Sequence, residues 1–421
     1  MNALIPGQIR NHKMFGGIGR ALSHKYYAIY WASNGINTTG RWMYRIAVGW
    51  LTWELTESTV WLGIIAFAET FPLVIFSVIA GALADRMGYI RITFIAQTAT
   101  ASVAVVFAIV TLSGFVSIEL VLIFALLIGS LEALTTPARM ALIHGLVPKQ
   151  DLAAAIGLQS ATFNGARFVG PAIAGAMIAT MGTGAVLWVV AGTFIQFCPI
   201  LLYIKVIEPE RKKGAFRNIW KDIVIGITYS VNHTGIRFLL VLLGITGLLI
   251  RPIIELMPAF AEEVFNSGSG GFGFLMSALG LGAMISCLWI GLRGETRGLT
   301  QLVTLSLLAQ GVALILSALT DSIWVAACCL GVVGFAMLVG GVGSQTLIQN
   351  SVEADVRARV MSLFILISWG LPAFGALLAG WIADFSGLSI TIAAGGVLTI
   401  VLWLWARPIA PKLQDDLEQR S

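Results

Sequence analysis

Long apolar runs alternate with short polar breaks along almost the whole chain. A membrane-spanning helix needs about 20 mostly apolar residues to cross about 30 Å of hydrocarbon, and runs of that length recur throughout the sequence. The predicted spans are 26–53, 59–83, 92–114, 118–138, 153–181, 184–206, 236–262, 270–291, 298–319, 323–349, 359–385 and 388–407. The pattern predicts an all-α integral membrane protein with twelve transmembrane helices.

The composition agrees with a membrane protein. Of the 421 residues, 57% are hydrophobic and 11% are charged, whereas a soluble domain carries about 25% charged residues. This balance excludes an ordinary cytosolic enzyme, a nucleic-acid-binding protein and a disordered scaffold. The sequence contains no nucleophile elbow, zinc-protease motif, phosphate-binding loop or dinucleotide fingerprint. We therefore expect no enzymatic activity, no cofactor and no nucleic-acid partner.

The cysteines predict no metal site. Cys198, Cys287, Cys328 and Cys329 all fall in apolar stretches, and none has a partner at metal-ligand spacing. We interpret them as small buried side chains.

A charged stretch at residues 207–222 divides the chain into two halves. The expected parts are a cytoplasmic N-terminal segment (1–25), an N-terminal six-helix bundle (26–206), a cytoplasmic linker (207–235), a C-terminal six-helix bundle (236–407) and a cytoplasmic tail (408–421).

The basic residues predict the orientation. Of the 26 Lys and Arg residues, four fall within spans: Arg41, Arg45, Arg167 and Arg251. All the others lie in the N-terminal segment, in alternate loops or the helix ends beside them, or in the tail. Because cytoplasmic loops carry the excess of Lys and Arg, we expect both termini in the cytoplasm of a bacterium, with the protein in its inner membrane.

Glycines reveal an internal repeat. One series recurs 210 residues later and a second recurs 205 residues later. The matched pairs are Gly63/Gly273, Gly81/Gly291, Gly88/Gly298, Gly165/Gly370, Gly170/Gly375, Gly175/Gly380 and Gly182/Gly387. Two homologous six-helix halves in parallel repetition are a known transporter design, with the substrate site between the halves.

Two loops carry a family resemblance. Between spans two and three the sequence reads Gly81-Ala-Leu-Ala-Asp85-Arg86-Met-Gly88-Tyr-Ile-Arg91, and a degenerate copy around Glu295 lies between spans eight and nine. The first loop resembles the signature loop of the major facilitator superfamily. Further stretches resemble the bacterial branch that contains the macrolide and enterobactin exporters: Thr136–Arg139, Leu146–Pro148 and Arg167–Pro171. The resemblance covers nearly the whole chain and implies the major facilitator fold, with two pseudo-symmetric six-helix bundles.

The signature loop suits a gate. Gly81 and Gly88 allow close packing and a sharp turn, and Asp85 can cap a helix or pair with a basic group. Arg86 and Arg91 can stay hydrated or bind lipid headgroups, which ordinary positive-inside charges would also do. The resemblance implies a gating role for Asp85, and Glu295 is its counterpart in the second half.

One position departs from the branch. Its members often carry an acidic residue after Gly in span one, but here the sequence reads Gly40-Arg41-Trp42. Proton coupling through that position is therefore excluded, since an arginine stays protonated.

Ionisable residues inside spans are costly and usually functional. Arg41 and Arg45 are four residues apart, as are Arg251 and Glu255, so each pair is expected to share a helix face. The 210-residue offset relates the two pairs. The resemblance implies that spans one, four, seven and ten line the cavity, which adds Glu132.

These charges allow two readings. The arginines present a fork of donors to a carboxylate, phosphate or catecholate, and the carboxylates can carry protons. Alternatively, Arg45 or Arg251 neutralises Glu255 as a bridge between the halves. Asn34, Asn37 and Gln345 contact substrate or act as packing contacts between helices.

Several charges have a simpler expected role. Glu132 can pair with Arg139, and Glu69 is expected to be structural. Arg167, beside Gly170 and Pro171, is expected to be structural too, because it can pair or extend toward the inner membrane surface.

We interpret the chain as a secondary active transporter that moves a small amphipathic or anionic organic molecule by alternating access, in proton-coupled export. The alternative is an uptake carrier for an anionic solute or siderophore, with arginines as ligands. A third class is a non-transporting membrane protein on a transporter fold. The expected partners are the substrate, protons and membrane lipids, and a monomer is expected.

Overall fold

The computed structural model describes residues 16–206 and 219–418, without the side chains of residues 77–82, 84–85, 219–223, 354 and 358. The elements of the first half are α1 (Gly16–Ser23), α2 (Lys25–Thr56), α3 (Thr59–Met87), α4 (Tyr89–Leu112), α5 (Ile118–Leu146), a 3-10 turn (Lys149–Asp151), α6 (Leu152–Met181), α7 (Thr183–Ile195) and α8 (Phe197–Tyr203). The described part of this half is therefore built of helices.

The second half is built in the same way. Its elements are α9 (Ile219–Asn232), α10 (Thr234–Leu249), the 3-10 helix η3 (Arg251–Leu256), α11 (Met257–Ala259), the π-helix η4 (Phe260–Val264), α12 (Gly268–Arg293), α13 (Leu299–Leu319), α14 (Ile323–Ser351), α15 (Ala354–Ser386), α16 (Leu388–Ala406) and α17 (Ala410–Glu418). The all-α membrane fold class is confirmed.

Ten helical segments among the described residues are long and apolar enough to cross a membrane. The two other predicted spans correspond to α2 and α6, which are 32 and 30 residues long. Both carry arginines, amides and small residues, and they pack against each other and their neighbours. A twelve-span count stays a prediction.

The seventh predicted span is not a continuous α-helix. It breaks after α10 into η3, α11 and η4. Pro252 and Pro258 account for the break, because proline has no amide hydrogen to donate to the preceding turn. Irregular winding of this kind is tolerated in a membrane protein where the segment is buried in protein, and Pro252 and Pro258 are both buried.

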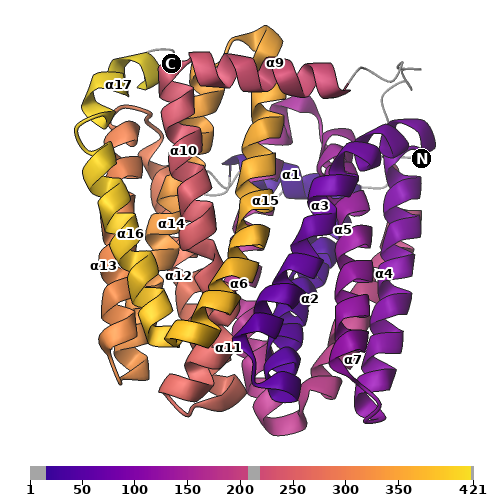
Figure 1. Cartoon of the computed structure of the whole chain (residues 1–421). Coiled ribbons are helices and arrows are strands. Elements are labelled where there is room, and N and C mark those ends of the chain that lie inside the picture. The colour runs from indigo at the N-terminus through magenta and orange to yellow at the C-terminus, as the bar shows by residue number, and fades with distance from the viewer. Residues whose placement is uncertain (1–15, 207–218, 419–421) are drawn as a thin grey trace, which may run out of the picture.

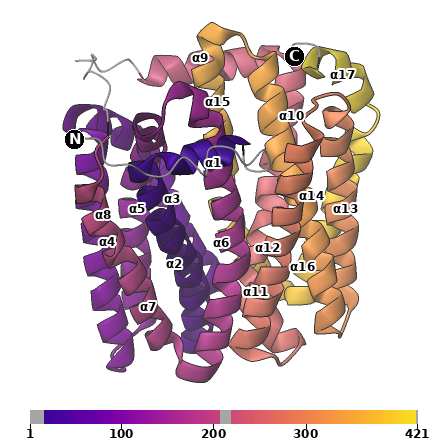
Figure 2. The same cartoon turned by 180° about the vertical axis from the view of Figure 1, so that it is seen from behind.

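The two halves stand side by side, and α1 and α17 lie at the same end of the molecule (Figure 1 and Figure 2). We call this the terminal end. The helix α9 lies crosswise to the long helices there. The halves touch mainly through α6 against α12 and α3 against α15.

Glycines bring these helices into backbone contact. A Cβ on Gly175 would lie 2.7 Å from the Cα of Gly273, and a Cβ on Gly63 would lie 2.4 Å from the carbonyl oxygen of Ala376. Small residues at membrane-helix interfaces allow such close approach. These contacts lie in the parts of the helices far from the terminal end, so the described halves are packed tightly together at the opposite end.

Candidate functional site

One ion pair joins the two halves. Arg45 on α2 binds Glu255 on η3, with Nη2 donating to Oε1. The two residues are 210 positions apart, which is the spacing of the internal repeat, so they are equivalent positions of the two halves. Residues related by a two-fold axis meet only near that axis. The pair therefore lies between the halves, near the axis that relates them.

The expectation that Arg251 and Glu255 share a helix face is wrong. They lie on a 3-10 helix, where residues four apart point about 120° apart, not the about 40° of an α-helix. Glu255 faces α2, whereas Arg251 turns to α15. There its Nη1 donates to the carbonyl oxygen of Ser368, and its guanidinium carbon lies 5.8 Å from the ring centre of Trp369.

A second network lies within the first half. Arg41 on α2 binds Glu132 on α5, and Arg139 donates to the same oxygen of Glu132 at 2.9 Å. The expected pairing of Glu132 with Arg139 is confirmed. The two residues are seven positions apart, which is about two turns of an α-helix, so they lie on the same face of α5. We call Arg41, Glu132 and Arg139 the N-half triad.

Arg167 on α6 lies at the contact between the halves. A Cβ on Gly280 of α12 would lie 2.5 Å from its carbonyl oxygen. Its guanidinium carbon is 5.5 Å from the ring centre of Trp42, and its Nε is buried without a hydrogen-bond partner among the described residues. No described carboxylate lies within 4.0 Å of it. Of the two expected roles, an ion pair is absent from the described part of the chain, and the guanidinium lies against an aromatic face.

Glu69 on α3 lies beside the pair that joins the halves. Its carboxylate and the Tyr44 hydroxyl are buried beside each other. The carboxylate is within electrostatic reach of Arg45 and Glu255. Its place beside the pair that joins the halves was missed. A carboxylate three residues before Pro72 in an apolar span was the signal that could have found it.

Five of these residues form one central cluster: Arg45, Glu69, Arg167, Arg251 and Glu255. Three arginines face two glutamates there, and two arginines share one glutamate in the N-half triad. When all are ionised, each group has an excess of one positive charge. Because the membrane interior penalises uncompensated charge, both groups favour a negatively charged neighbour.

The amides divide into two kinds. Asn37 is fully buried, and its Oδ1 accepts a hydrogen bond from Gln97 on α4 at 3.0 Å. Asn34 is buried as well, so both lie in positions suited to packing contacts. Gln345 on α14 is exposed. Gln97 was missed, although a lone amide in an apolar span is itself a sign of an interhelical hydrogen bond.

The signature loop lies where α3 meets α4. Gly88 has a φ of +89° at the start of α4, a conformation that favours glycine, so the expected sharp turn is present. Arg86, Arg91 and Glu295 are exposed. The side chains of positions 81 and 85 lie outside the described residues, so the gating prediction for Asp85 stays a prediction.

Gly170 and Pro171 take part in packing. A Cβ on Gly170 would lie 2.7 Å from the Cβ of Trp42 on α2. The carbonyl oxygen of Pro171 faces Gly273 on α12, where an added Cβ would lie 2.7 Å away. Both residues lie at close helix contacts.

In each half, hydrogen bonds to one carboxylate hold a terminal helix in place, and we call each of these contacts a tie. In the first half, Asp151 accepts hydrogen bonds from Arg20 and His24, both at 3.0 Å. In the second half, Glu418 on α17 accepts from the backbone amides of Gly298 at 2.6 Å and Thr300 at 2.9 Å. This carboxylate caps the N-terminus of α13, where anions are favoured. Neither tie was predicted.

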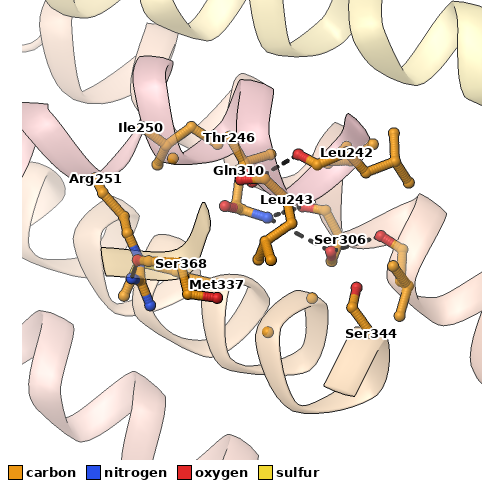
Figure 3. Close-up of a pocket in the computed structure, with 15 residues that line it drawn as sticks. Leu242, Leu243, Thr246, Ile250, Arg251, Ser306, Gln310, Met337, Ser344 and Ser368 are labelled. Atoms are coloured by element: carbon orange, nitrogen blue, oxygen red, sulfur yellow. Dashed lines mark hydrogen bonds between the residues drawn. The ribbon is translucent and has the colours of Figure 1, made fainter. Parts of the chain in front are cut away.

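The second half also contains a cavity of about 40 Å³ between α10, α13, α14 and α15 (Figure 3). Arg251 and Ser368 lie toward one end of it, and Ser306 and Ser344 lie toward the other, with Gln310 between them. The residues lining the cavity include one arginine and no carboxylate.

Two packed helical halves with charges at their centre define a membrane transporter of the major facilitator type. The comparisons with known proteins agree. Residues 20–420 match the MFS_3 family, described as transmembrane secretion effectors. The chain belongs to this family, whose members are transporters and not enzymes.

Similar proteins are known at full length. The chain is 27% identical over 397 residues to the staphyloferrin A transporter of Staphylococcus aureus, covering 93% of this chain and 98% of that protein. It is 27% identical over 397 residues to the multidrug efflux pump Tap of Mycolicibacterium fortuitum, covering 91% and 93%. The expected resemblance to the drug and siderophore exporter branch is confirmed.

Solved structures show the same fold. The nucleoside transporter NupG superposes with a TM-score of 0.73 at 13% identity, covering 91% of this chain and 98% of that one. A POT family transporter in complex with 5-aminolevulinic acid superposes with a TM-score of 0.71 at 14% identity, covering 96% and 99%.

Proposed function

We propose that this transporter exports a small amphipathic or anionic organic molecule in exchange for protons. The observation that carries the proposal is the pair of Arg45 and Glu255, because it joins the two halves near the axis that relates them. Breaking this pair removes one of the contacts that hold the halves together. The relatives named as a multidrug efflux pump and a siderophore transporter support a small organic passenger.

The places where the halves touch support alternating access. The close contacts of α6 with α12 and of α3 with α15 lie away from the terminal end. If the terminal end faces the cytoplasm, this arrangement is closed to the outside. Opening to the outside then requires these contacts and the Arg45–Glu255 pair to separate. A passenger or a proton drives the change only if it binds the two states with different affinity.

Glu255 is the proposed proton-carrying group. Protonation removes its negative charge, so its attraction for Arg45 falls and the closed state loses a stabilising contact. Return of the proton to the other side restores the pair. Glu69 lies within electrostatic reach of Arg45. The charge of that arginine is therefore still partly compensated while Glu255 is protonated.

An uptake carrier for an anionic solute or siderophore is the second candidate. It is favoured by Arg167 and Arg251, which have no carboxylate within 4.0 Å among the described residues. In this reading the arginines bind the passenger directly.

The decisive experiment uses the purified protein in liposomes with an imposed pH gradient and a panel of anionic and cationic compounds. Export predicts passenger flux coupled to proton flux, and loss of that coupling in Glu255→Gln. Glu119→Gln, an exposed carboxylate of α5, is the matched control and should behave as the wild type. Uptake predicts that Glu255→Gln keeps concentrative anion flux. If no compound moves and none changes proton flux, the transport proposal fails.

We also infer a monomer in the bacterial inner membrane with both termini in the cytoplasm. Single cysteines at exposed positions of α1 and α17, labelled from outside intact cells, test the orientation. Neither should react until the membrane is permeabilised.

A further inference from the structure

We propose that the cavity beside Arg251 is a binding site for one carboxylate-sized anion, held by Arg251, Ser344 and Ser368. This deepens the proposed function, and only the assignment of the anion to the passenger rests on that function. The anion is either an acidic group of the passenger or a free inorganic ion such as chloride.

The first argument is the hydrogen-bond balance of the cavity wall. Gln310 uses its amide hydrogens on Ser306, Ser306 donates to the carbonyl of Val303, and Thr246 donates to α10 carbonyls. These groups are already satisfied as donors.

Two hydroxyl donors remain. The Ser368 hydroxyl is buried without a partner among the described residues, and the residue is 7% exposed. Ser344 is 2% exposed and lines the same cavity. A buried hydroxyl without a partner is costly, so Ser368 indicates a missing acceptor, and Ser344 lies in the cavity wall where its hydroxyl can donate to the same acceptor.

The second argument is the charge of Arg251. Its only described hydrogen bond goes to the Ser368 carbonyl, which leaves further guanidinium hydrogens to donate. Arg45 and Arg167 both lie close enough to repel its charge, and Glu255 is the one carboxylate that attracts it. Because Glu255 is bound to Arg45, the compensation of Arg251 is incomplete.

The third argument is size. A water molecule needs about 10–15 Å³ of this kind of volume, so a cavity of about 40 Å³ has room for about three water-sized groups. That is the size of one carboxylate. The cavity is partly open, so the remainder of a larger molecule would lie outside it. A positively charged ligand is disfavoured, since no carboxylate lines the wall.

The test measures the thermal unfolding midpoint of the purified protein with increasing sodium acetate or sodium chloride. Sodium camphorsulfonate, whose sulfonate group is bulkier than a carboxylate and is held beside a rigid ring system, keeps the ionic strength constant. A ligand that binds only the folded state raises the midpoint in a saturable way. We expect saturable stabilisation by acetate, and about tenfold weaker apparent affinity for Ser344→Ala and for Ser368→Ala. Ser317→Ala, a buried serine of α13 outside the cavity, is the matched control and should keep wild-type affinity.

The outcomes separate the two sources. If chloride competes with acetate and neither serine variant changes passenger flux, the site holds a free anion. If an acidic passenger competes with acetate and loses flux in both variants, the site holds its acidic group. Either result supports an anion site.

The proposal is overturned if acetate and chloride stabilise no more than camphorsulfonate, or if both serine variants respond like the wild type. The cavity then holds water only. These results leave the transport proposal intact, because neutral or cationic passengers can still move in liposomes. If acetate binds saturably but no compound is transported, the transport proposal is contradicted and the anion-site proposal is still supported.

Discussion

The two halves compensate their buried charges in different ways. The first half pairs charge with charge: Glu132 binds Arg41 and Arg139, and Asp151 binds Arg20 and His24. In the second half, two charged groups instead bind the backbone. Arg251 donates to a carbonyl oxygen, and Glu418 accepts from two amides.

This difference shows what the internal repeat retains. Arg41 and Arg251 are equivalent positions, yet Arg41 binds a carboxylate and Arg251 does not. The repeat therefore preserves the helical scaffold and the location of an arginine, but not its partner. An arginine that binds a carboxylate, such as Arg41, is suited to a structural role, and an arginine without a carboxylate partner of its own, such as Arg251, is suited to binding an anion.

The largest expected effect is on the N-half triad. Glu132→Ala leaves Arg41 and Arg139 without their carboxylate partner. Removal of one partner from a buried ion pair lowers the free energy of unfolding by about 3–5 kcal/mol. The thermal midpoint and the folded yield after size-exclusion chromatography measure it. Glu119→Ala on the same helix is the control. Equal losses in the two variants would show that the triad is no more important than a surface carboxylate.

The second effect concerns the pair that joins the halves. We expect Arg45→Glu and Glu255→Arg each to reduce flux strongly, because each places like charges together. The double swap should recover part of the flux, with a coupling free energy of about 1–3 kcal/mol for residues in contact. A double-mutant cycle on unfolding and on flux measures it. Strict additivity of the two changes would contradict a direct interaction.

A smaller effect is expected for Arg251→Met. This change removes a cation without stranding a described carboxylate partner, so it should cost about 1 kcal/mol or less, and replacing buried charge with an apolar side chain can even stabilise. The thermal midpoint measures it beside Glu132→Ala. A loss as large as that of Glu132→Ala would remove the contrast between the halves.

The smallest effects concern the terminal helices. Hydrogen bonds from His24 and Arg20 hold the pKa of Asp151 below its ordinary value. The tie of α1 is therefore complete above that ordinary value, and it is lost as the pH falls through the lowered pKa. Protease cleavage within α1 measures its release, with Asp151→Asn as the variant that should lack this pH dependence.

High salt is expected to weaken the tie at Asp151 more than the tie at Glu418. For Glu418, burial acts to raise the pKa, and the amides of Thr300 and Gly298 outweigh it and lower the pKa. Because salt screens exposed ion pairs and Arg20 is more than half exposed, high salt should loosen α1 more than α17. Equal protection of both helices at high salt would contradict this difference.

Much of the architecture follows from the sequence. The apolar runs predict the long helices, and the glycine series predicts two halves. The pairing of Glu132 with Arg139 follows from helix geometry, and Glu255 with Arg45 is one of two partners that the charges allow.

The remaining features depend on how helices are rotated against one another, which periodicity does not specify. The contact of Arg41 with Glu132 and that of Asn37 with Gln97 both cross between helices. The turned position of Arg251 depends on the break in its helix. Pro252 and Pro258 were visible signals of that break, but a pattern of residues four apart assumes regular α-helical winding.

The irregular winding of η3 has a mechanical consequence. A 3-10 helix rises about 2.0 Å per residue and an α-helix about 1.5 Å, so rewinding six residues would shorten the segment by about 3 Å. It would also bring Arg251 and Glu255 from about 120° to about 40° apart. Such a rewinding would move Glu255 away from Arg45 and toward Arg251, and it would draw the helices on either side of the segment closer together by the same distance.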